Sequence, residues 1–338
     1  MPSSFDPAKD IPDLSDKTIL VTGGNAGLGK ATVEALAAHN PRCLYLCCRK
    51  RASGEALVQS IHEKYPDANV SVLELDLSDL DSVKQCAKEF QSRSEQLDCL
   101  ILNAGVSSTP YQKTKQGYEY QCATKYPLHS FIRPRLISHR FGVNHIGHSL
   151  LTQLLMPTLR ATRKSSPSGD VRIVVVSSKA VQLFPPKQGL ILDKMKTDGS
   201  SVNYLTLYGH SKLANVMFAR KLAQLYPDIT STSIHPGTVK SEIWSKPNVG
   251  GWFVNNVFAP FAVWLQGVSI EEGAKTQLWA ATAKVGGKGN VENGKFYLPI
   301  GKEAQYGKFA GDQAMVDELW RWTNEELQAH GSPGWPAA

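Results

Sequence analysis

The chain has 338 residues, of which 42% are hydrophobic and 20% are charged, a balance typical of a globular protein with a sizeable core. Its net charge of +7 does not predict a nucleic-acid-binding surface, because residues 122–140 supply four of these charges and contain no acid. The six cysteines have no paired spacing, so we expect reduced thiols and no structural metal site. Residues 1–16 form a polar extension without the apolar core of a signal peptide, which favours a cytoplasmic protein.

The first predicted unit is a strand, a glycine-rich turn and a helix. The apolar run 17–22 leads into a turn, and residues 30–39 have helical composition. The turn contains Gly23, Asn25, Gly27, Leu28 and Gly29. Glycines here permit close approach of a pyrophosphate to the amides at a helix N-terminus. The pattern predicts a dinucleotide site, with a plain turn as the alternative.

The second predicted strand, residues 43–48, ends in Arg49-Lys50-Arg51. In this architecture the end of that strand carries an acid for the ribose 2′-hydroxyl of NAD, or a cation for the 2′-phosphate of NADP. Because the position holds cations and no acid, Arg49 favours NADP(H) over NAD(H). The alternative is a solvated basic turn.

Strands and helices continue to alternate, with helices expected at 53–64 and 82–91 and strands at 70–75 and 97–102. This alternation predicts one α/β domain over residues 17–330, built as a doubly wound parallel sheet with helices on both faces. Asn103-Ala104-Gly105 ends the fourth strand. Asp76 follows the third strand and could accept from an adenine amino group or cap the next helix.

Residues 141–159 predict a long amphipathic helix that contains Asn144. We expect its His145 and His148 to pack or to cap rather than to bind a metal. A strand at 172–176 ends in Ser177-Ser178, and a strand at 230–235 ends in Pro236-Gly237. Two further helices are expected at 271–282 and 312–328, with Trp320 and Trp322 packing, and a disordered tail at 331–338.

Tyr208 is expected to open the helix that runs to about residue 226, and Lys212 follows four residues later on the same helical face. A nearby ammonium favours phenolate and lowers the pKa of a tyrosine, which suits a general acid or base. The spacing alone also fits a chance surface pair.

These motifs stand in a fixed order along the chain. They are Thr22-Gly23, Gly27, Gly29, Asn103-Ala104-Gly105, Asn144, Ser178, Tyr208, Lys212 and Pro236-Gly237. In this order they resemble the short-chain dehydrogenase/reductase superfamily, over roughly residues 17–300. Residues 141–148, 209–215 and 294–299 are similar to its retinol-dehydrogenase-like branch, which includes fungal carbonyl reductases of secondary metabolism.

The resemblance implies a Rossmann fold and a catalytic set. Tyr208 would exchange a proton with the substrate oxygen, and Lys212 would lower the Tyr208 pKa and hold the nicotinamide ribose. Ser178, with Ser177 as the alternative, would bind the substrate oxygen, and Asn144 would hold a water that links Lys212 to solvent. Ser241 stands where the family often has a threonine near the nicotinamide amide.

Two segments depart from the family pattern. Residues 122–140 interrupt the usual passage into the Asn144 helix, and we interpret them as a translated in-frame intron, with a basic loop that modulates substrate entry as the alternative. Residues 249–268 are uncharged but contain Asn255, Asn256 and Pro260, which argue against a membrane span. They fall in the family's variable lid, residues 238–270, and predict an apolar pocket, with contact to an intracellular membrane as the alternative.

The sequence thus predicts an NADP(H)-dependent oxidoreductase that interconverts a ketone or aldehyde and an alcohol. The expected partner is a small apolar carbonyl or alcohol, such as a lipid, a retinoid-like compound or a secondary metabolite, and not a nucleic acid. A homo-oligomer is compatible with the sequence. The alternative is a catalytically impaired NADP-binding protein with a regulatory or scaffolding role.

Overall fold

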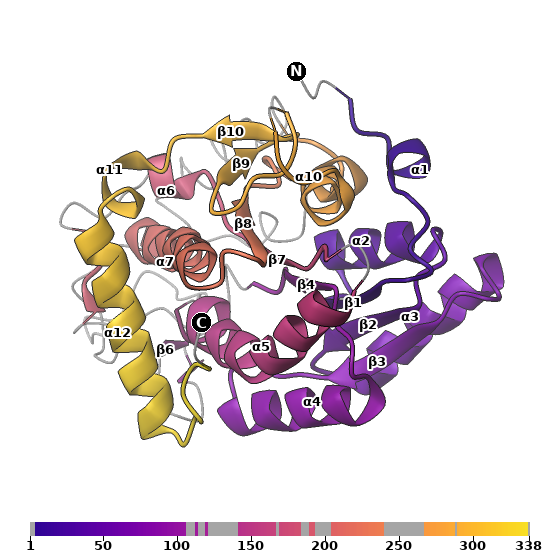
Figure 1. Cartoon of the computed structure of the whole chain (residues 1–338), viewed down its shortest axis with the longest axis horizontal. Helices are drawn as coiled ribbons and strands as arrows, with labels where there is room; N and C mark the ends of the chain where they lie inside the picture. The colour runs from indigo at the N-terminus through magenta and orange to yellow at the C-terminus, as the bar shows by residue number, and fades with distance from the viewer. Residues whose placement is uncertain are drawn as a thin grey trace, which may run out of the picture.

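A computed structural model describes residues 4–105, 112–113, 119–120, 141–166, 169–183, 189–192, 204–239, 267–287 and 289–336. Their centre is an eight-stranded sheet in the order β10-β9-β8-β7-β4-β1-β2-β3 (Figure 1). Its strands pair in parallel except for the antiparallel pair of β9 and β10. This mostly parallel sheet with flanking helices confirms the predicted α/β class.

The strands of the sheet are β1 (Thr18–Thr22), β2 (Cys43–Cys48), β3 (Val70–Glu74), β4 (Cys99–Leu102), β7 (Arg172–Val176), β8 (Thr230–Ile234), β9 (Phe296–Leu298) and β10 (Lys302–Ala304). Every residue of β1, β4 and β7 is buried, because these central strands are covered on both faces. The short strands β5 (Gln112–Lys113) and β6 (Glu119–Tyr120) form a separate antiparallel pair.

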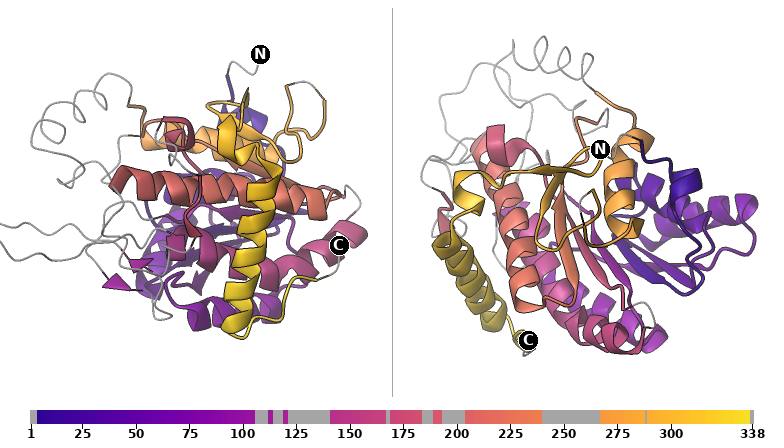
Figure 2. Two further views of the ribbon diagram at one scale, coloured as in Figure 1. Left: turned by 90° about the vertical axis from the view of Figure 1, so that its left-hand side faces the viewer. Right: turned by 45° about the horizontal axis from the view of Figure 1, so that its top comes forward.

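The helices are α1 (Pro7–Asp10), α2 (Gly27–Ala37), α3 (Arg51–Lys64), α4 (Leu80–Arg93), the π-helix η1 (Gly142–Gly147), α5 (His148–Ser165), α6 (Ala180–Leu183), α7 (Tyr204–Leu225), α10 (Ile270–Thr282), α11 (Gly307–Ala310) and α12 (Gln313–Ala329). Apolar side chains of α2, α3 and α10 form a core on one face of the sheet. Those of α4, α5, α7 and α12 form a second core on the other face. Figure 2 shows α12 crossing the outer side of α7.

The predicted helix at 141–159 differs from the observed one in its first turns. Residues 142–147 form the wider π-helix η1, and the α-helical hydrogen-bond pattern begins only at His148. Gly147 brings η1 against the chain after β3, since a Cβ there would lie 2.5 Å from the carbonyl oxygen of Leu77. Tyr208 does not open its helix, because α7 begins at Tyr204 and places the phenol one turn inside.

Both ends of the chain pack against the domain. Phe5, Ile11 and Leu14 of the polar extension are buried in the core beside α2 and α10. At the other end, the structure describes residues 331–336 of the segment predicted as a disordered tail. The ring of Trp335 lies 4.4 Å from that of Trp320, because a large indole removes apolar area from water even in a segment of small and polar residues.

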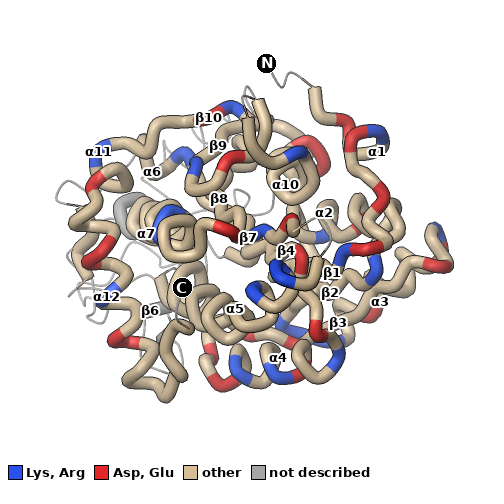
Figure 3. The backbone as a smooth tube through the Cα atoms, viewed as in Figure 1, with Lys and Arg blue, Asp and Glu red and all other residues tan. Residues whose placement is uncertain are grey.

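Lys and Arg positions are interspersed with Asp and Glu positions along the backbone in Figure 3. No described helix is long and apolar enough to cross a membrane.

Candidate active site

A cavity of about 500 Å³ opens at the carboxyl ends of β1 to β4. This edge of a parallel sheet, where the strand order reverses, is the usual dinucleotide site of the fold. Ten predicted cofactor residues line the cavity: Gly23, Asn25, Gly27, Leu28, Gly29, Arg49, Asp76, Asn103, Ala104 and Gly105. The structure therefore brings together side chains from four strand ends, and their contact with a cofactor remains a prediction.

The glycine turn fits a bound pyrophosphate. A Cβ at Gly29 would lie 2.1 Å from the carbonyl oxygen of Gly23, so α2 starts in contact with the turn. Gly27 has a φ of +51°, and a Cβ there would meet nothing within 4 Å, so the chain passes here beside open space. Ala26 gives α2 no side-chain cap, and the first amides of the helix suit an anion.

Asn103 holds the fourth strand end against the first. Its Nδ2 donates to the carbonyl oxygen of Thr22 at 2.8 Å, and its Oδ1 accepts from Gln277 of α10 at 3.3 Å. The next amide, Ala104 N, donates to the Thr22 hydroxyl at 2.9 Å. Asn103 and Ala104 thus fix the floor of the cavity.

The three cations after β2 separate in the structure. Arg49 lines the cavity, whereas Lys50 precedes α3 at its N-cap. Arg51 turns away and pairs with Glu89 at 3.1 Å. Only Arg49 among these three cations therefore lines the cavity.

Asp76 also lines the cavity, and its Oδ1 accepts from Ser78 N at 2.9 Å. The cap of the following helix α4 is Asp79, whose side chain accepts from Asp81 N at 3.0 Å. The capping alternative for Asp76 is therefore wrong, because Asp76 lies three residues too early and stabilises its own turn.

Tyr208 and Lys212 of α7 do not line the cavity, but Lys212 adjoins it at Gly105. Tyr208 is half-buried and Lys212 is buried, with the Lys212 ammonium 6.0 Å from the centre of the Tyr208 ring. Lys212 Nζ donates to the carbonyl oxygen of Val176 at 3.1 Å, which ties α7 to the end of β7. A Cβ at Gly105 would lie 3.6 Å from Lys212 Nζ, so the ammonium lies beside the turn that follows β4.

The two candidate serines after β7 have different surroundings. Ser177 is buried and donates to the backbone oxygen of Lys212 at 2.7 Å, so it serves the packing of α7. Ser178 is half-buried, and its hydroxyl accepts from Ala180 N at 3.1 Å. Of the two serines, Ser178 is therefore the more accessible.

Asn144 lies in η1 and is 1% exposed. Its Nδ2 donates to Ser211 of α7 at 3.3 Å, and its Oδ1 would lie 3.5 Å from a Cβ at Gly105. Asn144 and Lys212 therefore meet at Gly105, from two helices that are far apart in the chain.

Other predicted site residues lie elsewhere. Pro236 and Gly237 follow β8, where a Cβ on Gly273 of α10 would lie 3.4 Å from the Pro236 oxygen, and they do not line the cavity. Ser241, the suspected insertion 122–140 and most of the lid, residues 240–266, fall outside the described residues.

Six residues that line the cavity were not among the predicted cofactor residues: Ala26, Cys48, Leu75, Leu77, Val143 and Ile270. The first four lie in or directly beside the strand ends and the glycine turn that were predicted, whereas Val143 and Ile270 come from other segments. Val143 directly precedes Asn144, and Ile270 is the first residue of α10 after the lid. Proximity to the predicted Asn144 was a signal for Val143, whereas nothing in the local sequence marks Ile270.

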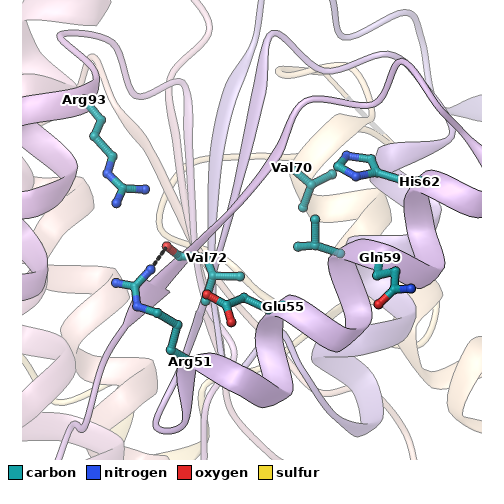
Figure 4. Close-up of a pocket in the computed structure, with 8 residues that line it drawn as sticks. Arg51, Glu55, Gln59, His62, Val70, Val72 and Arg93 are labelled. Carbon is teal, nitrogen blue, oxygen red and sulfur yellow. Dashed lines mark hydrogen bonds between the residues drawn. The ribbon is translucent and has the colours of Figure 1, made fainter.

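A second cavity of about 380 Å³ lies along the edge strand β3 (Figure 4). Arg51 Nη1 donates to the carbonyl oxygen of Val72 at 3.3 Å and so covers an edge carbonyl. Arg93 and Arg51 both pair with Glu89, whose carboxylate offsets part of their positive charge. This cavity is remote from Tyr208, and its side chains serve the sheet edge.

Comparison with known proteins agrees with the fold and shows the family. The family model for short chain dehydrogenases matches residues 17–190. A short-chain dehydrogenase/reductase of Armillaria gallica is 35% identical over 325 residues, covering 94% of this chain and 92% of that protein. Retinol dehydrogenase 12 of Homo sapiens is 35% identical over 274 residues, covering 80% of this chain and 75% of that protein. The solved RhlG/NADP complex of Pseudomonas aeruginosa has a TM-score of 0.60 at 20% identity, with coverage of 88% and 98%, and shows the fold alone.

The chain belongs to the short-chain dehydrogenase family, as an oxidoreductase with a nicotinamide cofactor that acts on small carbonyl or alcohol substrates. Its similarity to fungal members and to retinol dehydrogenases confirms the predicted retinol-dehydrogenase-like branch.

Proposed function

We propose that the protein uses NADP(H) to interconvert a ketone or aldehyde and an alcohol on a medium-sized apolar substrate. The observation that carries this proposal is the meeting of Asn144 and Lys212 at Gly105, beside Tyr208 and next to the cavity for the dinucleotide.

Each side chain of the catalytic set has a role that its position supports. Tyr208 donates its phenolic proton to the carbonyl oxygen during reduction and takes it back during oxidation. The buried Lys212 ammonium stabilises the phenolate by its charge, and Ser178 donates a hydrogen bond to the substrate oxygen. The nicotinamide, when bound, supplies or accepts the hydride.

The preference for NADP(H) rests on Arg49. It lines the cavity at the end of β2, where no acid stands to receive a ribose 2′-hydroxyl. A guanidinium there makes charge-assisted hydrogen bonds to a 2′-phosphate.

The apolar substrate is supported by composition and by relatives. Residues 249–268 contain no charged side chain. One of the relatives is named retinol dehydrogenase 12, and retinol is an apolar polyene alcohol. Sedimentation of the protein with liposomes at high salt would favour membrane contact over a pocket role for this segment.

The activity is tested by NADPH oxidation with a panel of hydrophobic ketones and aldehydes. We expect turnover by the wild type and a loss of kcat of about 10³-fold in Tyr208→Phe, with NADPH affinity retained. NADPH binding without turnover by either protein would favour the catalytically impaired alternative.

Cofactor choice is tested with Arg49→Ala against the matched control Arg51→Ala. We expect the first variant to lose roughly tenfold or more in kcat/KM for NADPH but not for NADH. Arg51→Ala should leave the NADPH/NADH ratio unchanged, since Arg51 faces Glu89. An unchanged ratio in Arg49→Ala would contradict the NADP(H) assignment.

A further inference from the structure

A buried histidine connects the two sides of the site. His148, the first residue of α5, is 1% exposed, and both of its ring nitrogens have partners. Nδ1 lies 3.0 Å from the backbone oxygen of Asn144, and Nε2 lies 2.9 Å from the Thr22 hydroxyl. The ring therefore spans from η1 to the end of β1.

The partners determine where the protons lie. A carbonyl oxygen can only accept, so Nδ1 carries a proton and donates to Asn144. Burial, followed by the nearby Lys212 charge, lowers the pKa of His148 to about 4, which leaves the ring neutral near pH 7. Nε2 then accepts from the Thr22 hydroxyl, whose other acceptor, the Ile101 oxygen, is more distant at 3.4 Å.

The hydrogen bond from the His148 ring to Asn144 matters because the backbone of η1 is irregular. In an α-helix the backbone N–H of His148 would donate to the Asn144 oxygen. Here that N–H donates to the His145 oxygen instead, and the ring of the same residue donates to Asn144. The His148 side chain thus supplies at Asn144 a bond that the regular helix would have supplied.

The same chain of hydrogen bonds reaches the Ala104–Gly105 turn after β4. Thr22 directly precedes Gly23, and its hydroxyl also accepts from Ala104 N at 2.9 Å. Ala104 is followed by Gly105, which adjoins both Asn144 Oδ1 and Lys212 Nζ. A continuous path therefore runs from Ala104 through Thr22 and His148 to the backbone of Asn144.

We propose that His148 is a positioning residue of the reaction, which holds the Asn144 carbonyl through Nδ1–H and so sets η1 against the Ala104–Gly105 turn. The inference rests on the proposed function of Asn144, Tyr208 and Lys212. His148 acts through Asn144 and touches neither substrate nor cofactor.

Two amide substitutions separate the two ring bonds. In His148→Asn the side-chain amide stands where Nδ1 stood and still donates to Asn144. In His148→Gln the amide reaches toward Thr22 and leaves the Asn144 oxygen without the ring donor. We expect His148→Gln to lose roughly tenfold in kcat, with KM for NADPH within about threefold, and His148→Asn to regain most of that loss.

Thr22→Ser and Thr22→Val test the other end of the path. The serine retains the hydroxyl and should retain kcat, whereas the valine should lower it. Melting temperatures of all four variants separate loss of fold from loss of turnover. Long-range proton–nitrogen spectra of histidine-labelled wild type should show the Nδ1–H tautomer for His148, assigned by its absence in His148→Asn.

An Nε2–H tautomer, or equal kcat in His148→Gln and His148→Asn, overturns the inference. These outcomes are distinct from failure of the proposed function. That failure would appear as a wild type without turnover on any carbonyl of the panel, whereas the tautomer is read without substrate.

Discussion

The two halves of the sheet build their sites in different ways. Around β1, β2 and β4, most cavity residues lie in short turns that directly follow the strands. Around β7 and β8, the site depends on contacts between distant segments, such as Asn144 with Ser211 and His145 with Thr323. A substitution in the first half therefore disturbs a turn, whereas one in the second half disturbs the fit between helices.

The largest expected effect is a loss of folding stability in acid, caused by buried histidines of the second half. Burial lowers the pKa of His145 to about 3 and of His148, His210 and His235 to about 4, from 6.5. Between pH 6.5 and 4 the unfolded chain binds more protons than the folded one, so the free energy of unfolding falls as pH falls. We expect a loss of roughly 1–2 kcal/mol per histidine between pH 7 and 5, measured by urea unfolding.

His210→Phe sharpens this test. Both ring nitrogens of His210 are buried and lack a hydrogen-bond partner within the described part of the chain. The phenylalanine variant should therefore fold and show a weaker pH dependence of unfolding. The same pH dependence in both proteins would mean that His210 does not contribute.

Lys212→Met should have the next largest effect. We expect kcat for NADPH oxidation to fall on the order of 10³-fold. The change removes the cation near Tyr208 together with the bond to the Val176 oxygen. Asn215→Ala is the control, because Asn215 Nδ2 donates to the same oxygen at 3.1 Å. A comparable kcat loss in this control would assign the effect to support of β7 rather than to the charge.

Gly29→Ala tests the first half. Its Cβ would meet the Gly23 oxygen at 2.1 Å, and we expect a loss of about 1–3 kcal/mol in stability together with weaker NADPH binding. Gly105→Ala is the matched control, since its Cβ would meet its neighbours at 3.5 Å or more. Thermal unfolding should rank Gly29→Ala below both the wild type and Gly105→Ala, and equal melting would contradict the close turn.

Thr323→Val gives the smallest expected effect. It removes the partner of His145 Nε2, a contact of 2.8 Å between η1 and α12, and should cost about 1 kcal/mol in urea unfolding. Thr323→Ser should restore the stability because it keeps the hydroxyl. If valine and serine behave alike, the hydrogen bond does not stabilise the contact between these helices.

Local patterns predicted the first half of the molecule well. The bounds of β2 agree with the prediction, because an apolar strand bounded by polar turns leaves little freedom in register. Glycine spacing and strand ends also located ten of the residues that line the cavity, since parallel strands bring their carboxyl ends to one edge.

The second half contains features that no local pattern indicates. The sequence of η1 is typical of an ordinary helix. Its π-helical form accompanies a contact with Leu77, which is distant in the chain, and a hydrogen bond from His148 on the next turn. The three-residue strands β9 and β10 are too short for periodicity to reveal. No local pattern predicts the hydrogen bond between Thr22 and His148, because the two residues are 126 positions apart.

The position of α12 has a consequence for the order of folding during synthesis. Phe218 of α7 stacks on Trp320, at 6.0 Å, and lies equally close to Trp335. These tryptophans leave the ribosome long after β1 to β4 and their helices have been completed. The helix that carries Tyr208 therefore keeps an uncovered aromatic face, open to chaperones, until the segment 313–336 has emerged.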